Sequence, residues 1–177
     1  MMPSPTAWTL SGLVFSLLAA LFFSKGGALF GAVAGLMVLV SGFFDIVDGS
    51  VARATGRASK RGAFLDSTLD RIGEVAMYFG ILLGNYAPPV LVLLAITLSL
   101  LVSYARAKAD SLNVSMAGVG IGERSERLVV LIVASLLGLV ALGVLIVAVI
   151  AFVTFVQRTV TVSRALGRKP KASAGGP

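Results

Sequence analysis

The chain has 177 residues, of which 57% are hydrophobic and only 13% are charged. Soluble domains hold about 25% charged residues, so this composition excludes a disordered chain and favours a protein embedded in a lipid bilayer. The lack of cysteine and histidine excludes disulfide bonds, imidazole bases, and thiolate or imidazole ligands for zinc.

Four uncharged stretches predict helices that cross the membrane. They cover residues 1–24, 26–44, 75–105 and 128–157. A helix needs about 20 residues to cross a roughly 30 Å hydrocarbon core, so the last two stretches are too long for one untilted helix each. The segment Asn85–Pro89 (NYAPP) predicts a turn in the third stretch, and small residues from Gly138 to Gly143 allow one in the fourth.

The predicted fold is therefore an all-α integral membrane protein with six transmembrane helices. Their expected ranges are 9–24, 27–53, 62–84, 89–110, 122–140 and 143–165. A single tilted helix in place of the last two would give five spans instead. We expect one transmembrane domain over residues 1–171 and a small flexible tail at residues 172–177.

Basic residues predict how these helices are oriented. In the six-helix arrangement one side of the membrane holds nearly all of them, whereas the opposite side has Lys25. Because cytoplasmic loops are enriched in Lys and Arg, both termini and a polar cavity are expected at the cytoplasmic side of a multi-pass cell-membrane protein. The net charge of +7 therefore indicates membrane orientation rather than nucleic-acid binding.

All eight acidic residues lie between Asp45 and Glu126, and four of them form two pairs at helical spacing. Asp45 and Asp48 are three residues apart and Asp66 and Asp70 are four apart, so each pair lies on one helix face. A charge at the membrane centre costs on the order of 3 kcal/mol, and facing carboxylates repel one another unless a cation lies between them. This spacing favours one or two hard divalent ions such as Mg²⁺, Mn²⁺ or Ca²⁺.

Two other interpretations of these acids stay open on spacing alone. In the first, the acids form ion pairs in a solvated loop with neighbouring basic residues, namely Arg53, Arg57, Lys60 and Arg61. In the second, they line an ion or proton pathway, because acids inside a membrane commonly do so. A small cation carrier is therefore the competing class of function.

The acidic pairs belong to a longer pattern, D-x2-D-G-x2-A-R-x8-G-x3-D-x3-D, which runs from Asp45 to Asp70. Gly49 and Ala52 have almost no side chain, so a flat ring and a pyrophosphate can lie close to the helix backbone. Arg53 can offer a fork of donors to a phosphate. With every position present, the pattern resembles the signature of the CDP-alcohol phosphotransferase family, and the resemblance extends over essentially the whole chain.

The resemblance implies a metal-dependent transferase of phospholipid biosynthesis that takes a CDP-linked lipid and releases CMP. Two ions, Mg²⁺ or Mn²⁺, would be bound by Asp45, Asp48, Asp66 and Asp70. Asp70 would also remove the proton from the acceptor hydroxyl. The residues expected at the CDP-lipid are Asp48, Gly49, Ala52, Arg53, Ser59 and Gly62. Thr6, Trp8 and Thr9 join them from the string P-T-A-W-T, which resembles the family element P-[DN]-x-x-T with Thr6 replacing its acidic or amide residue.

A second set of charges predicts the acceptor. Arg106, Arg127 and Arg158 come from three predicted helices, and if they converge they form a pocket for a dianionic phosphate. The alternative is that they snorkel to the membrane interface. The strings S-Y-A-R-A-K-A-D, E-R-S-E-R-L and V-Q-R resemble the phosphatidylinositol-phosphate synthase branch and its archaeol-using relatives. In that branch the three basic residues bind inositol phosphate, with Arg106 here replacing the more usual Lys.

The expected reaction is transfer of a phosphatidyl or archaetidyl group from CDP-diacylglycerol or CDP-archaeol to inositol 1-phosphate. Glycerol 3-phosphate as acceptor, or CDP-inositol as a soluble donor, stays open as an alternative within the family. The resemblance also implies a homodimer, and small residues such as Gly80 and Gly84 permit close contact between helices.

Overall fold

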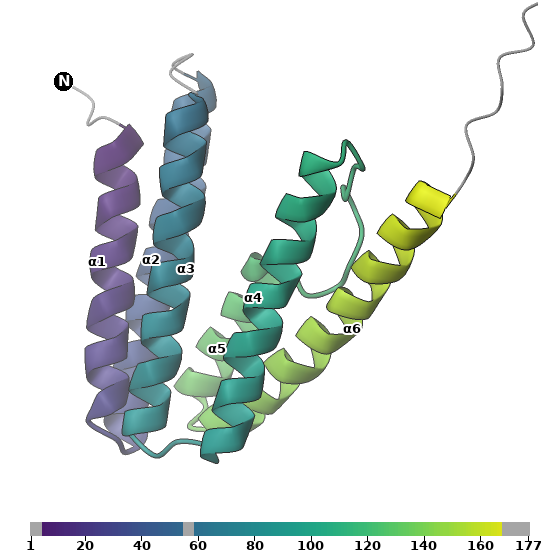
Figure 1. Cartoon of the computed structure of the whole chain (residues 1–177). Helices are drawn as coiled ribbons and strands as arrows, with labels where there is room; N and C mark the ends of the chain where they lie inside the picture. The colour runs from purple at the N-terminus through teal and green to yellow at the C-terminus, as the bar shows by residue number, and fades with distance from the viewer. Residues whose placement is uncertain (1–4, 55–58, 168–177) are drawn as a thin grey trace, which may run out of the picture.

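The computed structural model describes residues 5–54 and 59–167, and the side chains of residues 8–47 and 59–167. The described chain is all-helical, with helices α1 (Pro5–Ser24), α2 (Ala28–Ala54), α3 (Lys60–Leu83), α4 (Pro89–Ser111), α5 (Arg124–Leu136) and α6 (Val140–Gly167). Successive helices run up and down, so that α1 and α3 begin at the end of the molecule where α2 and α4 finish (Figure 1). The prediction of an all-α fold with six helices is confirmed.

Three of these helices are long and apolar enough to cross a membrane by length and composition. The apolar ranges are Ala28–Val47, Pro89–Ser111 and Val140–Gly167, and α1 adds a shorter apolar stretch, Trp8–Ser24. Large apolar side chains such as Leu29 and Val90 are exposed on the outer faces of these helices, as on a surface that meets lipid. Helix α5 has only 13 residues and rises roughly 20 Å, which is less than the thickness of the hydrocarbon core.

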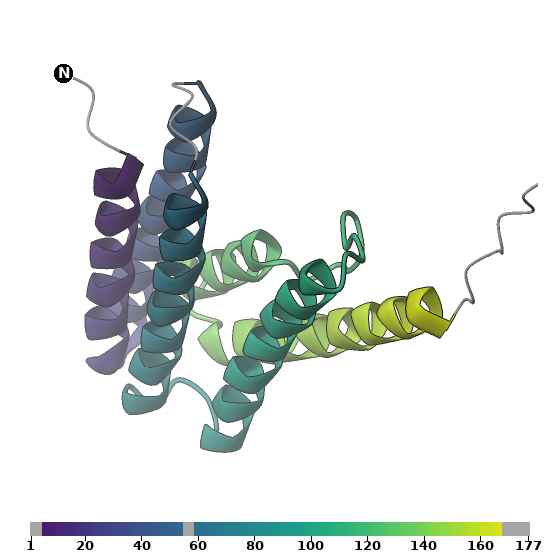
Figure 2. The ribbon, with the colours of Figure 1, turned by 45° about the horizontal axis from the view of Figure 1, so that its top comes forward.

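The helices pack as two unequal groups joined by α5. Helix α1 packs on α2 and α3, α4 packs on α6, and α5 contacts both α2 and α6. Figure 2 shows α1, α2 and α3 side by side, while α6 leans away from them. Helix α5 therefore carries its first turn into the space between the two groups.

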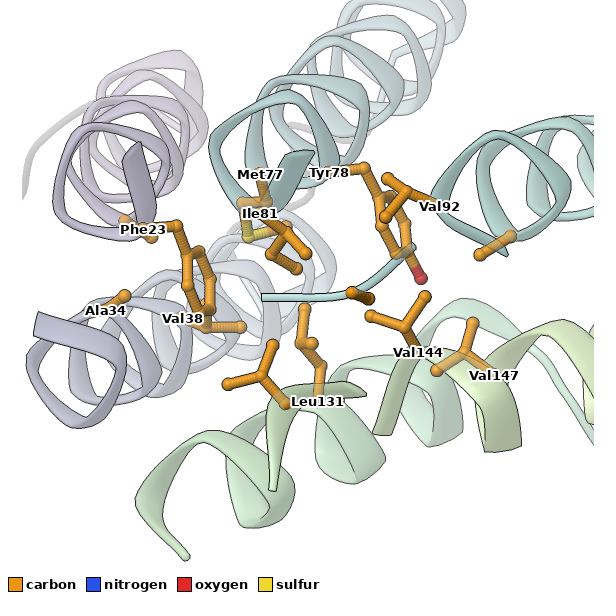
Figure 3. Close-up of a cluster of buried hydrophobic side chains, with 14 of the residues drawn as sticks. Phe23, Ala34, Val38, Met77, Tyr78, Ile81, Val92, Leu131, Val144 and Val147 are labelled. Atoms are coloured by element: carbon orange, nitrogen blue, oxygen red, sulfur yellow. The ribbon is translucent and has the colours of Figure 1, made fainter. Parts of the chain in front are cut away.

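A cluster of buried apolar side chains holds all six helices together (Figure 3). Phe23 of α1, Ile81 of α3, Val92 of α4 and Val144 of α6 contribute to it, and each lies near the end of its helix that joins a short turn. This cluster occupies the half of the molecule that contains the turns α1–α2, α3–α4 and α5–α6. The charged residues of the predicted site that the structure describes lie in the other half.

Small residues allow α3 to lie directly on α1. A Cβ atom at Gly80 would overlap the backbone of Ala20, and one at Gly84 would overlap that of Phe23. Such close approach at small residues is typical of helices packed in a membrane. Gly80 and Gly84 were expected to permit close contact between helices. The contact that they allow is the packing of α3 on α1 within one chain.

The turn between α5 and α6 contains no polar side chain, yet its backbone groups are hydrogen-bonded. Gly138 has a positive φ of 72°, the Leu139 N–H donates to Ala134 O at 2.7 Å, and the Gly138 N–H donates to Ser135 O at 3.2 Å. This is a Schellman motif, which ends a helix by using its own last carbonyl groups. Helix α5 consequently ends at Leu136 rather than at residue 140, and α6 begins at residue 140 rather than 143.

The connection from α4 to α5 turns back toward the interior of the molecule, as Figure 1 shows. Gly120, with φ 113°, and Gly122 lie against α6, where a Cβ atom at Gly122 would be 2.9 Å from Ile150 O. These two glycines allow the segment to reach the inner side of α6. As a result, the first residues of α5 lie deeper than the end of α4.

Candidate active site

Three of the four predicted aspartates meet between α2 and α3. Asp45 of α2 and Asp66 and Asp70 of α3 each offer one carboxylate oxygen, and these oxygens lie within 4.8 Å of one another. All three residues are partly buried. Oxygen donors at this spacing fit a hard divalent ion such as Mg²⁺ or Mn²⁺, and the arrangement brings the two predicted pairs together.

Several predicted site residues lie where side chains are not described. Thr6 lies in α1, and Asp48, Gly49, Ala52 and Arg53 lie in the last turns of α2, all beyond the described side chains. The predicted tail at 172–177 and Arg57 lie outside the described residues altogether.

The predicted CDP-lipid residues that are described lie at the same end of the molecule. The Ser59 hydroxyl caps α3 by accepting from the Gly62 N–H at 3.0 Å, which accounts for both residues structurally. The Trp8 ring lies 5.6 Å from that of Phe44, and both Trp8 and Thr9 are half-buried. Trp8 thus packs beside the residue that precedes Asp45.

A cation also lies at the aspartates. Arg124, in the first turn of α5, contacts Asp45, and its Nη1 lies 3.0 Å from Asp70 Oδ2. Arg71 is farther from the same Asp70 oxygen, at 3.5 Å. The acidic cluster therefore includes a positive charge supplied by a third helix.

A cavity of about 470 Å³ opens beside the cluster and has a polar and an apolar part. Asp45, Asp70 and the arginines of α4, α5 and α6 line the polar part. The apolar part is lined mainly by α2 and α5, through Leu39, Phe43, Ile46, Val129 and Ile132. A molecule with a charged head and an apolar body has the chemistry to fill such a space.

Two of the three predicted phosphate-binding arginines converge on one carboxylate. The Oε1 atom of Glu123 lies 3.4 Å from Arg106 Nη1 and 3.0 Å from Arg158 Nη2. The buried Arg158 is also oriented by hydrogen bonds of 3.0 Å to the carbonyl oxygens of Val102 and Val119. Glu123 thus marks a point where an anion meets two guanidinium groups from different helices.

The third arginine, Arg127, faces a different partner. Its Nε and Nη2 donate to Glu74 at 2.9 to 3.1 Å, and its Nη1 donates to Gly122 O at 2.7 Å. The side chains of Arg127 and Glu74 are 1% and 3% exposed, so the pair is almost fully desolvated. Arg127 lines the cavity, but most of its donors are directed away from it.

Sequence reasoning gave no site role to Glu74, Glu123 or Arg124. A signal for Glu74 was present, because it follows Asp70 by four residues and continues the same helix face. Glu123 and Arg124 stand in the string E-R-S-E-R-L beside Arg127. Nothing in that string tells which of its charges reach the cavity.

The family described as CDP-alcohol phosphatidyltransferase matches residues 2–156 of the chain. The chain belongs to this family. It is 38% identical over 133 residues to the archaetidylinositol phosphate synthase of Pyrococcus horikoshii, covering 75% of this chain and 69% of that one. It is 40% identical over 128 residues to the protein of the same name from Methanothermobacter thermautotrophicus, covering 72% and 64%. The chain thus spans about two thirds of the length of these curated relatives.

Solved structures of a phosphatidylinositol phosphate synthase have a similar fold. The phosphatidylinositol phosphate synthase of Mycobacterium tuberculosis, in complex with manganese and citrate, superposes with a TM-score of 0.80 at 27% identity, covering 94% of this chain and 87% of that one. The same enzyme with CDP-DAG bound gives a TM-score of 0.75, covering 90% and 86%. The predicted family resemblance is confirmed.

Proposed function

We propose that this phosphatidyltransferase moves the lipid-phosphate group of CDP-diacylglycerol or CDP-archaeol to inositol 1-phosphate and releases CMP. The observation that carries the proposal is the meeting of Asp45, Asp66 and Asp70, two of which, Asp45 and Asp70, line a cavity that also has apolar lining residues. The names of the relatives support the acceptor, since both are archaetidylinositol phosphate synthases.

Two ions, Mg²⁺ or Mn²⁺, are proposed at Asp45, Asp66 and Asp70, with Asp48 as the fourth ligand. The oxygen-only donor set fits such ions, and the related enzyme was crystallised with manganese. When bound, the ions would neutralise charge on the pyrophosphate of the donor.

The chain's own residues would then position the acceptor and take its proton. Asp70 would accept the hydroxyl proton of inositol phosphate, so that the oxygen attacks the lipid-side phosphorus as the bond to CMP breaks. Arg106 and Arg158 would hold the acceptor phosphate where Glu123 now meets them. Arg127, bound to Glu74, would shape the wall of this pocket.

The donor would lie across the ends of α1, α2 and α3. Its nucleotide is proposed to contact the N-terminal and motif residues, namely Thr6, Trp8, Thr9, Asp48, Gly49, Ala52, Arg53, Ser59 and Gly62. The apolar wall that includes Leu39, Phe43 and Ile46 would accept the lipid body.

We propose that all six helices belong to one transmembrane domain over residues 1–171, with both termini and the active site at the cytoplasmic side. Lys60 and Arg61 begin α3, and Arg164 lies in the last turn of α6 at the same end of the molecule, whereas Lys25 lies in the turn at the opposite end. This distribution supports the orientation. The homodimer stays a prediction that Gly80 and Gly84 do not support, because they pack against α1.

A lipid-synthesis assay tests the function. Purified full-length protein with CDP-archaeol or CDP-diacylglycerol, Mn²⁺ and radiolabelled inositol 1-phosphate is expected to yield chloroform-soluble label and an equal amount of CMP. Removing the metal with EDTA should stop both. Label from glycerol 3-phosphate but not from inositol phosphate would overturn the acceptor, and ion flux in proteoliposomes without CMP would favour a carrier.

Arg158→Ala is expected to raise the KM for inositol phosphate by about 10- to 100-fold, because a charge-assisted hydrogen bond contributes about 1.5–3 kcal/mol. The KM for the CDP-lipid should change little. Steady-state kinetics with each substrate varied in turn measures both values. Arg164→Ala, an exposed arginine farther along α6, is the matched control and should leave both unchanged. A larger increase in the KM for the CDP-lipid than in the KM for inositol phosphate would contradict the assignment of Arg158 to the acceptor phosphate.

A further inference from the structure

Arg124 is placed where a metal ion would be bound. Its guanidinium contacts Asp45 of α2 and lies 3.0 Å from Asp70 of α3, two of the three carboxylates that come within 4.8 Å of one another. Its side chain is only 13% exposed. A guanidinium between these carboxylates and a divalent ion bound by the same carboxylates are like charges at short range, so each weakens the binding of the other.

Arg124 and Arg127 share a face of α5 but are held very differently. Arg127 directs three nitrogens to Glu74 and Gly122, which fixes its guanidinium. Among the described atoms, the Nε of Arg124 is buried without a hydrogen-bond partner. Arg124 is therefore the less constrained of the two, and its side chain adjoins a cavity large enough to receive it.

We propose that Arg124 is an internal competitor of the metal ion. Its guanidinium must leave Asp45 and Asp70 before the ion binds fully. The guanidinium neutralises the carboxylates in the absence of the ion and thereby lowers the apparent affinity for it. Because α5 fixes its Cα atom, the displaced side chain stays in the cavity with Arg106 and Arg158. This inference rests on the metal centre of the proposed function, but not on the identity of the acceptor.

Binding of Mn²⁺ in the absence of substrates tests the proposal. Electron paramagnetic resonance of free Mn²⁺, titrated with purified full-length protein, gives the dissociation constant directly. Arg124→Gln is expected to bind Mn²⁺ about tenfold more tightly, as for a site that the competitor fills about nine-tenths of the time. Arg124→Lys should lie between this variant and the wild type, because it keeps the charge but loses the planar fork.

Arg71→Gln is the matched control, since Arg71 Nη1 lies 3.5 Å from the same Asp70 oxygen, which Arg124 Nη1 approaches to 3.0 Å. It should tighten Mn²⁺ binding by less than about threefold, through reduced repulsion alone. If both glutamine variants bound Mn²⁺ more tightly by the same factor, the effect of Arg124 would be that of any nearby positive charge. This result would overturn the proposal. Unchanged or weaker binding in Arg124→Gln would overturn it as well.

Failure of the metal centre itself gives a different result. In that case neither the wild type nor any arginine variant would bind Mn²⁺, and Asp45→Asn would have no effect on the titration. Gel filtration and thermal unfolding of each variant establish that it is folded. If Arg124→Gln does not fold, Arg124→Lys carries the test, and Mn²⁺ binding no tighter than in the wild type overturns the proposal.

Discussion

Asp70→Asn is expected to abolish turnover while leaving the CDP-linked lipid bound. The amide cannot accept the hydroxyl proton, and a positioned general base contributes about 10²- to 10⁴-fold to the rate. Loss of a carboxylate ligand should lower the rate further by weakening the metal site. The labelled-inositol-phosphate assay measures turnover, and protection against thermal unfolding by added CDP-lipid measures binding.

Glu126→Gln is a matched control for this change. Glu126 is an exposed acid in the first turn of α5, and its substitution removes one carboxylate without touching the acidic cluster. It should retain wild-type turnover. Normal turnover in Asp70→Asn would reject the role of Asp70 as general base. If the variant lost CDP-lipid binding together with turnover, the result would support Asp70 only as a metal ligand.

The second large effect is expected on stability rather than chemistry. Glu74→Ala should lower the free energy of unfolding by about 3–5 kcal/mol, because it leaves Arg127 charged and buried without its partner. Arg127→Met should have a similar effect. Replacing both residues by apolar side chains, as in Glu74→Leu with Arg127→Met, should recover most of the loss. Denaturant unfolding of the detergent-solubilised protein measures all three.

Glu126→Gln again serves as the comparison, since an exposed acid contributes little to stability. If Glu74→Ala unfolded at the wild-type denaturant concentration, the buried ion pair would not be a major support of the fold. The double variant also informs on the acceptor. A nearly normal KM for inositol phosphate in that protein would confine Arg127 to shaping the pocket.

Much of the acidic site could be predicted from the sequence because its spacing is local. Asp66 and Asp70 share a face of one helix, and a charge cluster in an apolar chain needs a common partner. The meeting of Asp45 with them follows once α2 and α3 run antiparallel through a short connection. The helix ends at Leu136 and Val140 were harder to predict, because a Schellman turn is closed by backbone groups and leaves no polar residue to read.

The partners of the arginines could not be predicted in the same way. Arg124 and Arg127 are three residues apart and share a helix face, so periodicity treats them alike. Their depth along α5 decides the outcome: Arg124 comes level with Asp45 and Asp70, and Arg127 comes level with Glu74. That level depends on how far the α4–α5 connection turns inward, which rests on the packing of Gly120 and Gly122 against α6.

The acidic cluster lies within the helix bundle, well away from the tips of α2 and α3. Asp45 precedes the last residue of α2 by roughly 14 Å of helix, and Asp70 follows the first residue of α3 by roughly 15 Å. In the proposed orientation the sugar phosphate would have to pass between the cytoplasmic ends of the helices to reach a lipid that stays anchored in its leaflet.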